Sequence, residues 1–119
     1  MSSILITGGC GFVGSNIALH LAASFADARI VCMDNLYRRG SELNVSRLQG
    51  LGIKFHHGDV RTPASFPPEA FDVLIECSAE PSVLAGQDGS PDYLFTTNVV
   101  GLYHCLEHCR RNGKADRER

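Results

Sequence analysis

The chain has 119 residues, 44% of them hydrophobic, and a formal net charge of −2. This length predicts one small domain with a buried core, and the nearly balanced charge gives no general field for nucleic acid or an anionic membrane. No apolar run approaches the about 20 residues needed to span a bilayer, and the first predicted strand begins too close to Met1 to leave room for a signal peptide. Five cysteines, at positions that suit core and helix sites better than a disulfide framework, predict a reducing, cytoplasmic setting.

Strand and helix patterns alternate along the chain. We expect strands at about 3–7, 29–33, 53–57 and 71–76, and helices at about 11–24, just after residue 41, and from 91 to 112. This alternation is typical of an α/β fold with a doubly wound parallel sheet of about four strands and helices on both faces. The sequence therefore predicts a partial Rossmann domain.

The two N-terminal helices have predicted buried faces. In the first helix the expected core positions are Val13, Ile17, Ala18 and Leu21. In the second, Ser41 is the expected N-cap residue. The apolar contacts of that second helix are expected from Leu43, Val45, Leu48 and Leu51.

Residues 7–14 read Thr-Gly-Gly-Cys-Gly-Phe-Val-Gly, directly after an apolar run and before a helix-compatible stretch. Glycines at these spacings let the backbone approach a bulky anion, and the following helix directs its unpaired N–H groups and positive dipole end toward that anion. We assign Gly8 to the tight turn, Gly11 to the close approach of a pyrophosphate, and Gly14 to packing of the first helix against the sheet. The alternative is a glycine turn that binds nothing.

Asp34 ends the second apolar run, twenty positions after Gly14. In a dinucleotide-binding fold a carboxylate at this distance accepts hydrogen bonds from the adenosine ribose. It also repels a 2′-phosphate, so NAD is favoured over NADP as cofactor. Arg38 and Arg39 leave NADP open, since a nearby guanidinium is how a 2′-phosphate is usually accommodated. The alternative is that both arginines simply lie in an exposed loop.

Further candidates stand beyond the later strands. Asp59 is expected to accept a hydrogen bond from the adenine amino group, with a turn-forming aspartate as the alternative. The small residues Cys77, Ser78 and Ala79 follow the fourth strand and leave space for a cofactor at the sheet edge. Asn98, early in the long helix, is expected to hold the preceding loop or to contact the nicotinamide side.

Cys105 and Cys109 stand four apart on the same long helix, interleaved with His104 and His108. Such pairs can share a metal ion, but no further ligand pair of zinc-site spacing follows, so we predict no metal site. Gly101 in this helix predicts close packing against the sheet.

Four segments together resemble the extended short-chain dehydrogenase/reductase family, and within it the NAD-dependent nucleotide-sugar epimerases and dehydratases. They are residues 7–14, the Asp-Asn-Leu of 34–36, the His-Gly-Asp-Val of 57–60 and the Asn-Val-Val-Gly of 98–101. The resemblance covers residues 3–113. The loop 34–40, Asp-Asn-Leu-Tyr-Arg-Arg-Gly, is similar to that of the CDP-paratose (tyvelose) 2-epimerase branch.

The resemblance implies a set of contacts with NAD. The pyrophosphate would be lined by Gly8, Gly11, Phe12, Val13 and Gly14. The adenosine ribose would be held by Asp34 and Asn35, and the adenine by Asp59 and Val60. The far half of the cofactor would face Cys77, Ser78 and Ala79, with Asn98 supporting that loop. Relatives often read His-Leu-Ala-Ala-Gln where residues 76–80 read Glu-Cys-Ser-Ala-Glu, and the two carboxylates put the usual contacts of that segment in doubt.

The family's catalytic Tyr-x-x-x-Lys pair does not occur in the sequence, because none of Tyr37, Tyr93 and Tyr103 has a lysine four positions later. The resemblance thus implies no catalytic residue here, and no sugar-binding portion. We expect a truncated NAD-binding portion of such an enzyme, unable to convert a nucleotide sugar alone. The alternative is a non-catalytic, dinucleotide-binding regulatory module that acts through a partner chain.

Residues 114–119 are too polar to form another strand. The fourth strand is therefore expected at an open, apolar edge of the sheet, a position from which strands pair with other chains. We expect self-association through this edge, through the long helix, or through both.

Overall fold

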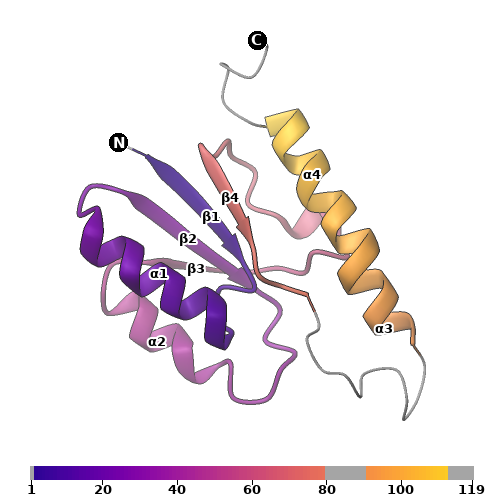
Figure 1. Cartoon of the computed structure of the whole chain (residues 1–119), viewed down its shortest axis with the longest axis horizontal. Coiled ribbons are helices and arrows are strands. Elements are labelled where there is room, and N and C mark those ends of the chain that lie inside the picture. Colours follow the sequence, from indigo (N-terminus) through magenta and orange to yellow (C-terminus); the bar gives the residue numbers. More distant parts are fainter. Residues whose placement is uncertain (1, 80–90, 113–119) are drawn as a thin grey trace.

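The structure, a computed structural model, describes residues 2–79 and 91–112. Four parallel strands, β1 (Ser3–Thr7), β2 (Arg29–Asp34), β3 (Lys54–His57) and β4 (Val73–Glu76), form one sheet in the order β3-β2-β1-β4 (Figure 1). The predicted doubly wound α/β sheet is confirmed, and each strand lies close to its expected bounds.

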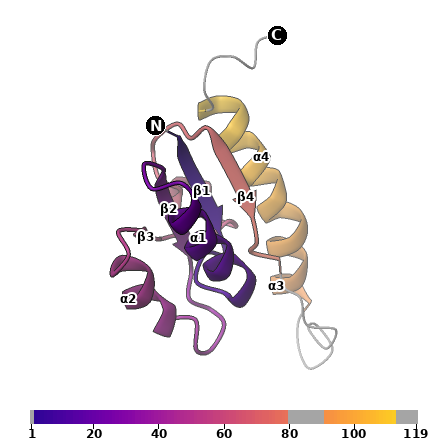
Figure 2. The same ribbon diagram turned by 60° about the vertical axis from the view of Figure 1, so that its left-hand side comes forward.

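Helices cover both faces of this sheet. On one face lie α1 (Phe12–Ser24) and α2 (Leu43–Gln49). On the other face, a continuous helical run consists of α3 (Asp92–Phe95), the π-helical turn η2 (Thr96–Val100) and α4 (Gly101–Asn112). A short 3₁₀ helix, η1 (Pro63–Ser65), lies in the connection from β3 to β4. Figure 2 shows α4 running alongside β4, away from α1 and α2.

Two hydrophobic layers follow from the alternation of side chains along each strand. The layer beneath α1 and α2 contains Ile4, Ile6, Ile30, Cys32 and Leu48. The layer beneath α4 contains Leu5, Val31, Met33, Val60, Phe66, Phe71 and Cys105. Because both faces of the central strands are buried, β1 and β2 are apolar almost throughout, as expected for a covered parallel sheet.

The predicted buried face of α1 is wrong at Val13, which is 57% exposed. The helix begins at Phe12, with Gly11 as its N-cap, and small residues bury its first turns: Gly14, Ser15 and Ala18. Larger side chains meet the core only further along, where Ile17 and Leu21 pack against it. The helix starts against the glycine turn itself, and this contact leaves room only for small residues.

The predicted contacts of α2 are also partly wrong. Ser41 is not its N-cap: the helix begins at Leu43, and the Ser41 hydroxyl instead donates to the Arg38 carbonyl at 2.7 Å. Leu43 is 75% exposed, while Leu48 is buried. Leu51 lies beyond the helix and is exposed as well. A helix of seven residues has room for few inward positions, and Val45 and Leu48 fill them.

The long C-terminal helix is confirmed, although it contains the π-helical turn that the sequence did not reveal. Gly101 allows the predicted close packing, because a Cβ there would lie 2.5 Å from Cγ2 of Val60. Gly113, a residue type that often caps a helix C-terminus, lies outside the described residues, as do residues 80–90 before the helix.

β4 lies at one end of the described sheet and pairs there with β1 alone, as expected for an edge strand. Val73 on this strand is 46% exposed. None of the helices that the structure describes has the length and apolarity needed to cross a membrane.

Candidate functional site

The glycine turn after β1 depends on contacts that only glycine permits. Gly8 has φ +68°, and a Cβ on it would lie 2.3 Å from the Cys77 carbonyl oxygen. A Cβ on Gly14 would lie 2.3 Å from the Gly8 carbonyl oxygen. The turn assigned to Gly8 is therefore confirmed, and Gly14 allows the start of α1 to approach that turn closely. At Gly11 a Cβ would meet only the Gly8 oxygen, at 3.4 Å.

Gly11 therefore presents an open backbone surface at the start of α1. No side chain caps this helix end, so the N–H groups of its first turn can donate to an anion, which the helix dipole also favours. This is the environment that the spacing of the glycines predicts.

Asp34 faces the glycine turn. Its Oδ2 accepts from the Cys10 N–H at 2.9 Å and its Oδ1 from the Leu36 N–H at 2.8 Å. Leu36 has φ +58°, a conformation uncommon outside glycine, which helps turn the chain back toward the carboxylate. A carboxylate offers about four lone-pair positions, so each oxygen keeps one for a sugar hydroxyl. The carboxylate thus holds the turn together and remains able to accept further hydrogen bonds.

The end of β3 is joined to the loop after β2 by a polar network. Asn35 donates through Nδ2 to Asp59 Oδ2 at 3.0 Å and to the Tyr93 hydroxyl at 3.3 Å. Arg61 forms an ion pair with Asp59 at 2.7 Å. Burial by itself would raise the pKa of Asp59, but the hydrogen bonds from Arg61 and Asn35 outweigh it and lower the pKa to about 2. Asp59 is therefore a fixed anion with much of its hydrogen-bonding capacity already used.

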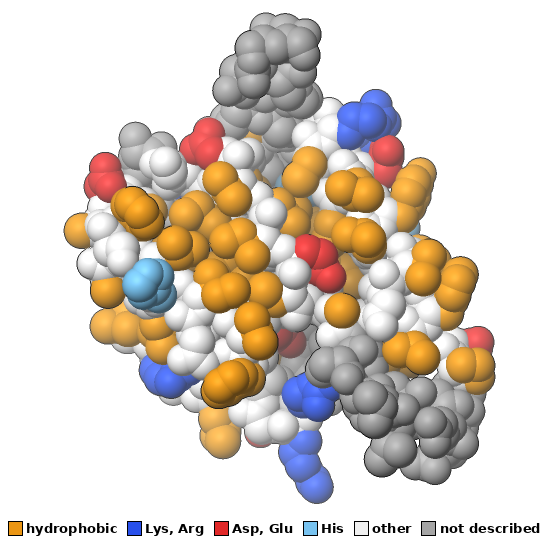
Figure 3. Space-filling model, in the orientation of Figure 1, with side chains coloured by type: hydrophobic (Ala, Val, Ile, Leu, Met, Phe, Trp, Pro, Cys, Tyr) orange, Lys and Arg blue, Asp and Glu red, His pale blue; other side chains and the backbone are white. Residues whose placement is uncertain are grey.

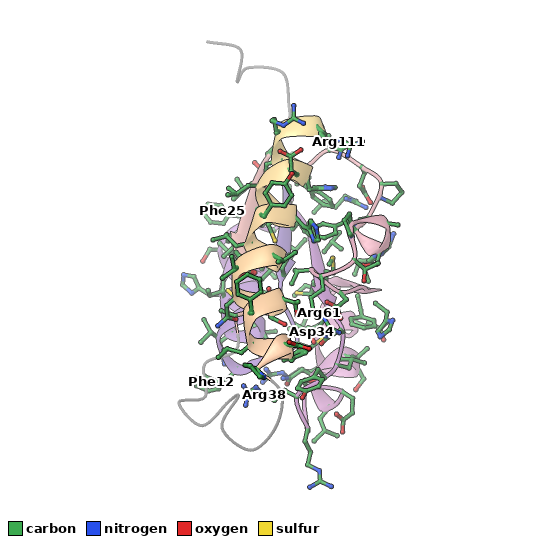
Figure 4. The ribbon with its side chains drawn as sticks, turned by 90° about the vertical axis from the view of Figure 1, so that its right-hand side faces the viewer. Phe12, Phe25, Asp34, Arg38, Arg61 and Arg111 are labelled. Carbon is green, nitrogen blue, oxygen red and sulfur yellow. The ribbon has the colours of Figure 1, made fainter. Side chains whose placement is uncertain are left out.

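Aromatic rings close this end of the site. The rings of Tyr37 and Tyr93 stack with centroids 4.0 Å apart, and the Arg61 guanidinium lies 4.6 Å from the centroid of Tyr93. Tyr37 follows β2 and Tyr93 belongs to α3, so the stack connects the two sides of the site. In the view of Figure 4, Arg61 and Asp34 are both seen toward the α3 end of the helical run.

Glu76 organises the chain after β4. Its Oε1 accepts from the Thr7 hydroxyl and from both the backbone N–H and the hydroxyl of Ser78. The Cys77 N–H donates to the Thr7 carbonyl oxygen at 2.9 Å, which continues the hydrogen bonds between β1 and β4. Glu76, which stands where similar proteins often have histidine, thus fixes the turn after β4. It also binds the hydroxyl group of Ser78.

These elements surround one cavity of about 80 Å³ at the carboxyl ends of the strands, where ligands bind in open α/β sheets. Most of the predicted cofactor residues line it, namely Gly8, Gly11, Asp34, Asn35, Asp59, Val60, Cys77, Ser78 and Ala79. Four predicted residues do not. Phe12 lines a neighbouring cavity, Val13 is exposed, Gly14 lies behind the turn, and Asn98 lies in η2.

The cavity is smaller than the about 300–1,000 Å³ usual for small-molecule sites.

Thr97 is the most informative residue that the sequence did not predict. It lines the cavity, is only 3% exposed, and its Oγ1 has no hydrogen-bond partner among the described residues. Such an unpaired buried hydroxyl costs about 1–3 kcal/mol, and a ligand that reached it from the cavity would recover this cost. Thr97 lies in η2, a π-helical turn that no pattern in the sequence indicated. Tyr37, Tyr93, Met33 and Ser41 also line the cavity.

The cysteines and histidines of α4 have structural surroundings. His104 hydrogen-bonds through Nδ1 to the Val60 carbonyl at 2.7 Å, and His108 stacks on Phe66. Burial raises the pKa of the Cys105 thiol to about 12. Within residues 2–79 and 91–112, no three His, Cys, Asp or Glu side chains gather as metal ligands would.

A model of the NAD dependent epimerase/dehydratase family matches residues 4–117. The chain belongs to this family. It is 32% identical over 117 residues to the CDP-paratose 2-epimerase of Salmonella typhi, an alignment that covers 91% of the chain and 32% of that enzyme. It is 30% identical over 116 residues to the dTDP-D-glucose 4,6-dehydratase of Dictyostelium discoideum, covering 92% of the chain and 26% of the enzyme.

Solved structures agree. The crystal structure of a dTDP-glucose 4,6-dehydratase from Bacillus anthracis in complex with NAD matches with a TM-score of 0.75 and 25% identity, over 96% of the chain and 36% of that protein. The chain thus spans between 26% and 36% of the length of these relatives. It corresponds to the N-terminal, NAD-binding region of epimerases and dehydratases, which confirms the resemblance seen in the sequence.

Proposed function

We propose that the chain binds NAD as the cofactor-binding portion of a nucleotide-sugar epimerase or dehydratase. The observation that carries this proposal is the common cavity of the glycine turn, Asp34 and Thr97. Around it, an open glycine backbone, a carboxylate with unused lone pairs and a buried unpaired hydroxyl offer the donors and acceptors that a dinucleotide needs. The crystal structure of the Bacillus anthracis relative holds NAD, which supports the same ligand here.

Each group has a separate part in the proposed site. The first-turn N–H groups of α1, beside Gly11, would donate to the pyrophosphate. Asp34 would accept from the hydroxyls of the adenosine ribose, and by itself it favours NAD over NADP. Asp59 and Val60 would border the adenine, with Asn35 beside the ribose, and residues 77–79 would face the other half of the cofactor, where Asn98 would support their loop. In a complete enzyme, bound NAD supplies a hydride acceptor for the sugar.

Thr97→Val tests this site directly, because it removes the unpaired hydroxyl and keeps the shape of the side chain. The free protein should become no less stable, since a buried polar group without a partner is removed. NAD affinity, measured by isothermal titration calorimetry, should fall about fivefold to tenfold, the value of one hydrogen bond. Thr96→Val is the matched control, because the Thr96 hydroxyl already donates to the Asp92 carbonyl at 2.7 Å.

Absence of NAD binding by the unaltered chain would refute the proposed function. Equal NAD affinities for the unaltered chain and Thr97→Val would remove Thr97 from the site.

We further propose that these 119 residues convert no nucleotide sugar by themselves, because they contain no Tyr-x-x-x-Lys pair. Measurable conversion of any nucleotide sugar would overturn that statement. The five free cysteines support a reducing, cytoplasmic location.

We also propose that the chain associates with a second copy. One side of α3, η2 and α4 carries exposed apolar residues at helical spacing, here called the outer helical face: Phe95, Val99, Leu102, Tyr103 and Leu106. Figure 3 shows hydrophobic side chains on the part of the surface where Figure 1 places α4. Such a patch marks an interaction surface. Among residues 2–79 and 91–112, β4 pairs on one side only, and an open strand edge of this kind can pair with another chain. The same face favours the second candidate function, a non-catalytic module that acts through a partner chain.

A further inference from the structure

A separate cavity, here called the α4 cavity, lies between α4 and the connection from β3 to β4. Its volume is about 290 Å³, close to the lower end of the range of about 300–1,000 Å³ that is usual for small-molecule sites. It shares no lining residue with the cavity beside the glycine turn. A ligand bound here would therefore not compete directly with a dinucleotide.

Flat rings form much of the wall of the α4 cavity. Phe66 is almost fully buried, and the ring of His108 stacks on it with centroids 5.1 Å apart. Tyr103 is exposed, and its ring lies 5.7 Å from the ring of His104. Burial lowers the pKa of His108, so its ring is neutral near pH 7 and adds apolar surface. Such a wall favours an aromatic ligand, which stacks on it or packs edge-on against it.

His104 gives this wall a hydrogen-bond acceptor. Its Nδ1 lies 2.7 Å from the Val60 carbonyl oxygen. A carbonyl oxygen only accepts, so the proton of the neutral imidazole is on Nδ1 and Nε2 keeps its lone pair. No hydrogen bond to this Nε2 occurs among the described residues, and the bond to Val60 fixes the orientation of the ring. A ligand that meets His104 therefore needs a donor.

Arg111 gives the cavity a cation. The lining contains one carboxylate, Glu107, which is already bound by Arg110 through contacts of 2.8 and 3.0 Å. Arg111 itself is exposed and forms no hydrogen bond or ion pair within residues 2–79 and 91–112. A guanidinium of this kind can bind a carboxylate through paired hydrogen bonds. In the view of Figure 4, Arg111 is seen near the C-terminal end of α4.

The spacing of these two polar groups sets the length of a ligand. His104 and Arg111 stand seven positions apart on α4, hence on the same face and about 10 Å apart along the helix axis. A benzene ring with polar groups at opposite ends, and with a hydrogen bond at each of them, spans a similar length.

We propose that the α4 cavity binds a small aromatic carboxylate that carries a hydrogen-bond donor at the other end of its ring. The ring lies against Phe66 and Tyr103, the carboxylate pairs with Arg111, and the donor reaches Nε2 of His104. A single guanidinium and a volume of about 290 Å³ suit one ring and one carboxylate. The inference is independent of the proposed function, because it uses none of the residues that line the dinucleotide cavity.

Titration of the isotope-labelled chain with para-hydroxybenzoate, followed by two-dimensional amide NMR spectra, tests the proposal. The amide signals of residues 63–66 and 103–112 should shift with a Kd of about 0.1–1 mM, as expected for a ligand of about ten non-hydrogen atoms. Two analogues separate the contacts. The neutral para-hydroxybenzamide lacks the carboxylate and benzoate lacks the donor, so each should bind about threefold to tenfold more weakly.

Arg111→Ala should weaken para-hydroxybenzoate about fivefold to tenfold, but para-hydroxybenzamide less than twofold. The matched control is Arg39→Ala, because Arg39 is equally exposed but does not line this cavity. Both replacements are at exposed positions, so the thermal unfolding curves should match that of the unaltered chain.

Two results would overturn the proposal. One is the absence of saturable shifts in the named amide signals at millimolar para-hydroxybenzoate. The other is equal binding of the acid and its amide, whether in the unaltered chain or as an equal loss of both in Arg111→Ala. Neither result bears on the proposed function, which the separate titration with NAD decides.

Discussion

Replacing Gly14 with alanine should damage both the fold and the proposed cofactor site. The new Cβ would lie 2.3 Å from the Gly8 carbonyl oxygen and 3.0 Å from the Gly9 Cα. Ordinary contact begins at about 3.4 Å, so α1 and the turn must separate by about 1 Å. No side-chain rotation can relieve the contact, since the atoms on both sides belong to the backbone or are fixed to it.

The expected cost follows from two opposing effects. Overpacking costs about 1–3 kcal/mol, and alanine returns about 1 kcal/mol relative to glycine through its helix propensity. The net destabilisation should therefore be about 0–2 kcal/mol, which lowers Tm by up to roughly 15 °C in a domain of this size. The shifted turn should also weaken NAD binding at least about tenfold, because an anion site tolerates little displacement of its donors.

Gly11→Ala separates the two effects. Gly11 has φ −77° and ψ 178°, which any residue adopts, and its Cβ would meet the Gly8 oxygen at an ordinary 3.4 Å. The free energy of unfolding, from thermal unfolding curves, should change by less than about 0.5 kcal/mol. Calorimetry should show weakened NAD binding, because the methyl group would stand where the pyrophosphate approaches. If Gly14→Ala left both Tm and NAD affinity unchanged, the assigned packing of α1 on the turn would be wrong. If Gly11→Ala bound NAD normally, the pyrophosphate would lie elsewhere.

Two further predictions concern charge and association. The pKa of Asp59 is about 2 in the folded chain and about 3.9 when unfolded, so its carboxylate stabilises the fold fully above about pH 4 and loses this effect as pH falls through about 2. The free energy of unfolding in urea, measured between about pH 2 and 6, should show this decline, and Asp59→Asn should make it smaller. If the free energy fell equally steeply with pH in both proteins, the assigned pKa would be contradicted. On the outer helical face, serine at both Val99 and Leu106 should weaken self-association at least tenfold in light scattering, because each apolar side chain buried at a contact contributes about 1.5–3 kcal/mol. Gln49→Ala on α2 is the control, and an unaltered chain that stays monomeric at high concentration would contradict the proposal.

The parts of the site that the sequence predicted depend on local spacing. Gly8 must adopt a positive φ directly after a strand, and Asp34 must end the neighbouring strand, so their positions along the chain determine their meeting at the sheet edge. Cys77 and Ser78 follow in the same way from the parallel register of β4 with β1.

The features that escaped prediction depend on contacts between distant segments. Thr97 lines the cavity and lies in a π-helical turn, within a run that reads as ordinary helix. Leu43 matches a buried helical position by pattern, yet α2 is too short for it to reach the sheet. The pairing of Tyr37 with Tyr93 joins residues on opposite sides of the site. Periodicity within one segment contains no information about such partners.

The stacked tyrosines give the molecule a built-in optical reporter. The chain has no tryptophan and three tyrosines, and two of these form a stack in the lining of the cavity beside the glycine turn. Ultraviolet emission therefore arises largely from the mouth of the site, with the third contribution from the exposed Tyr103. Any ligand that parts the two rings changes this intrinsic fluorescence, so occupancy can be followed without attaching a dye.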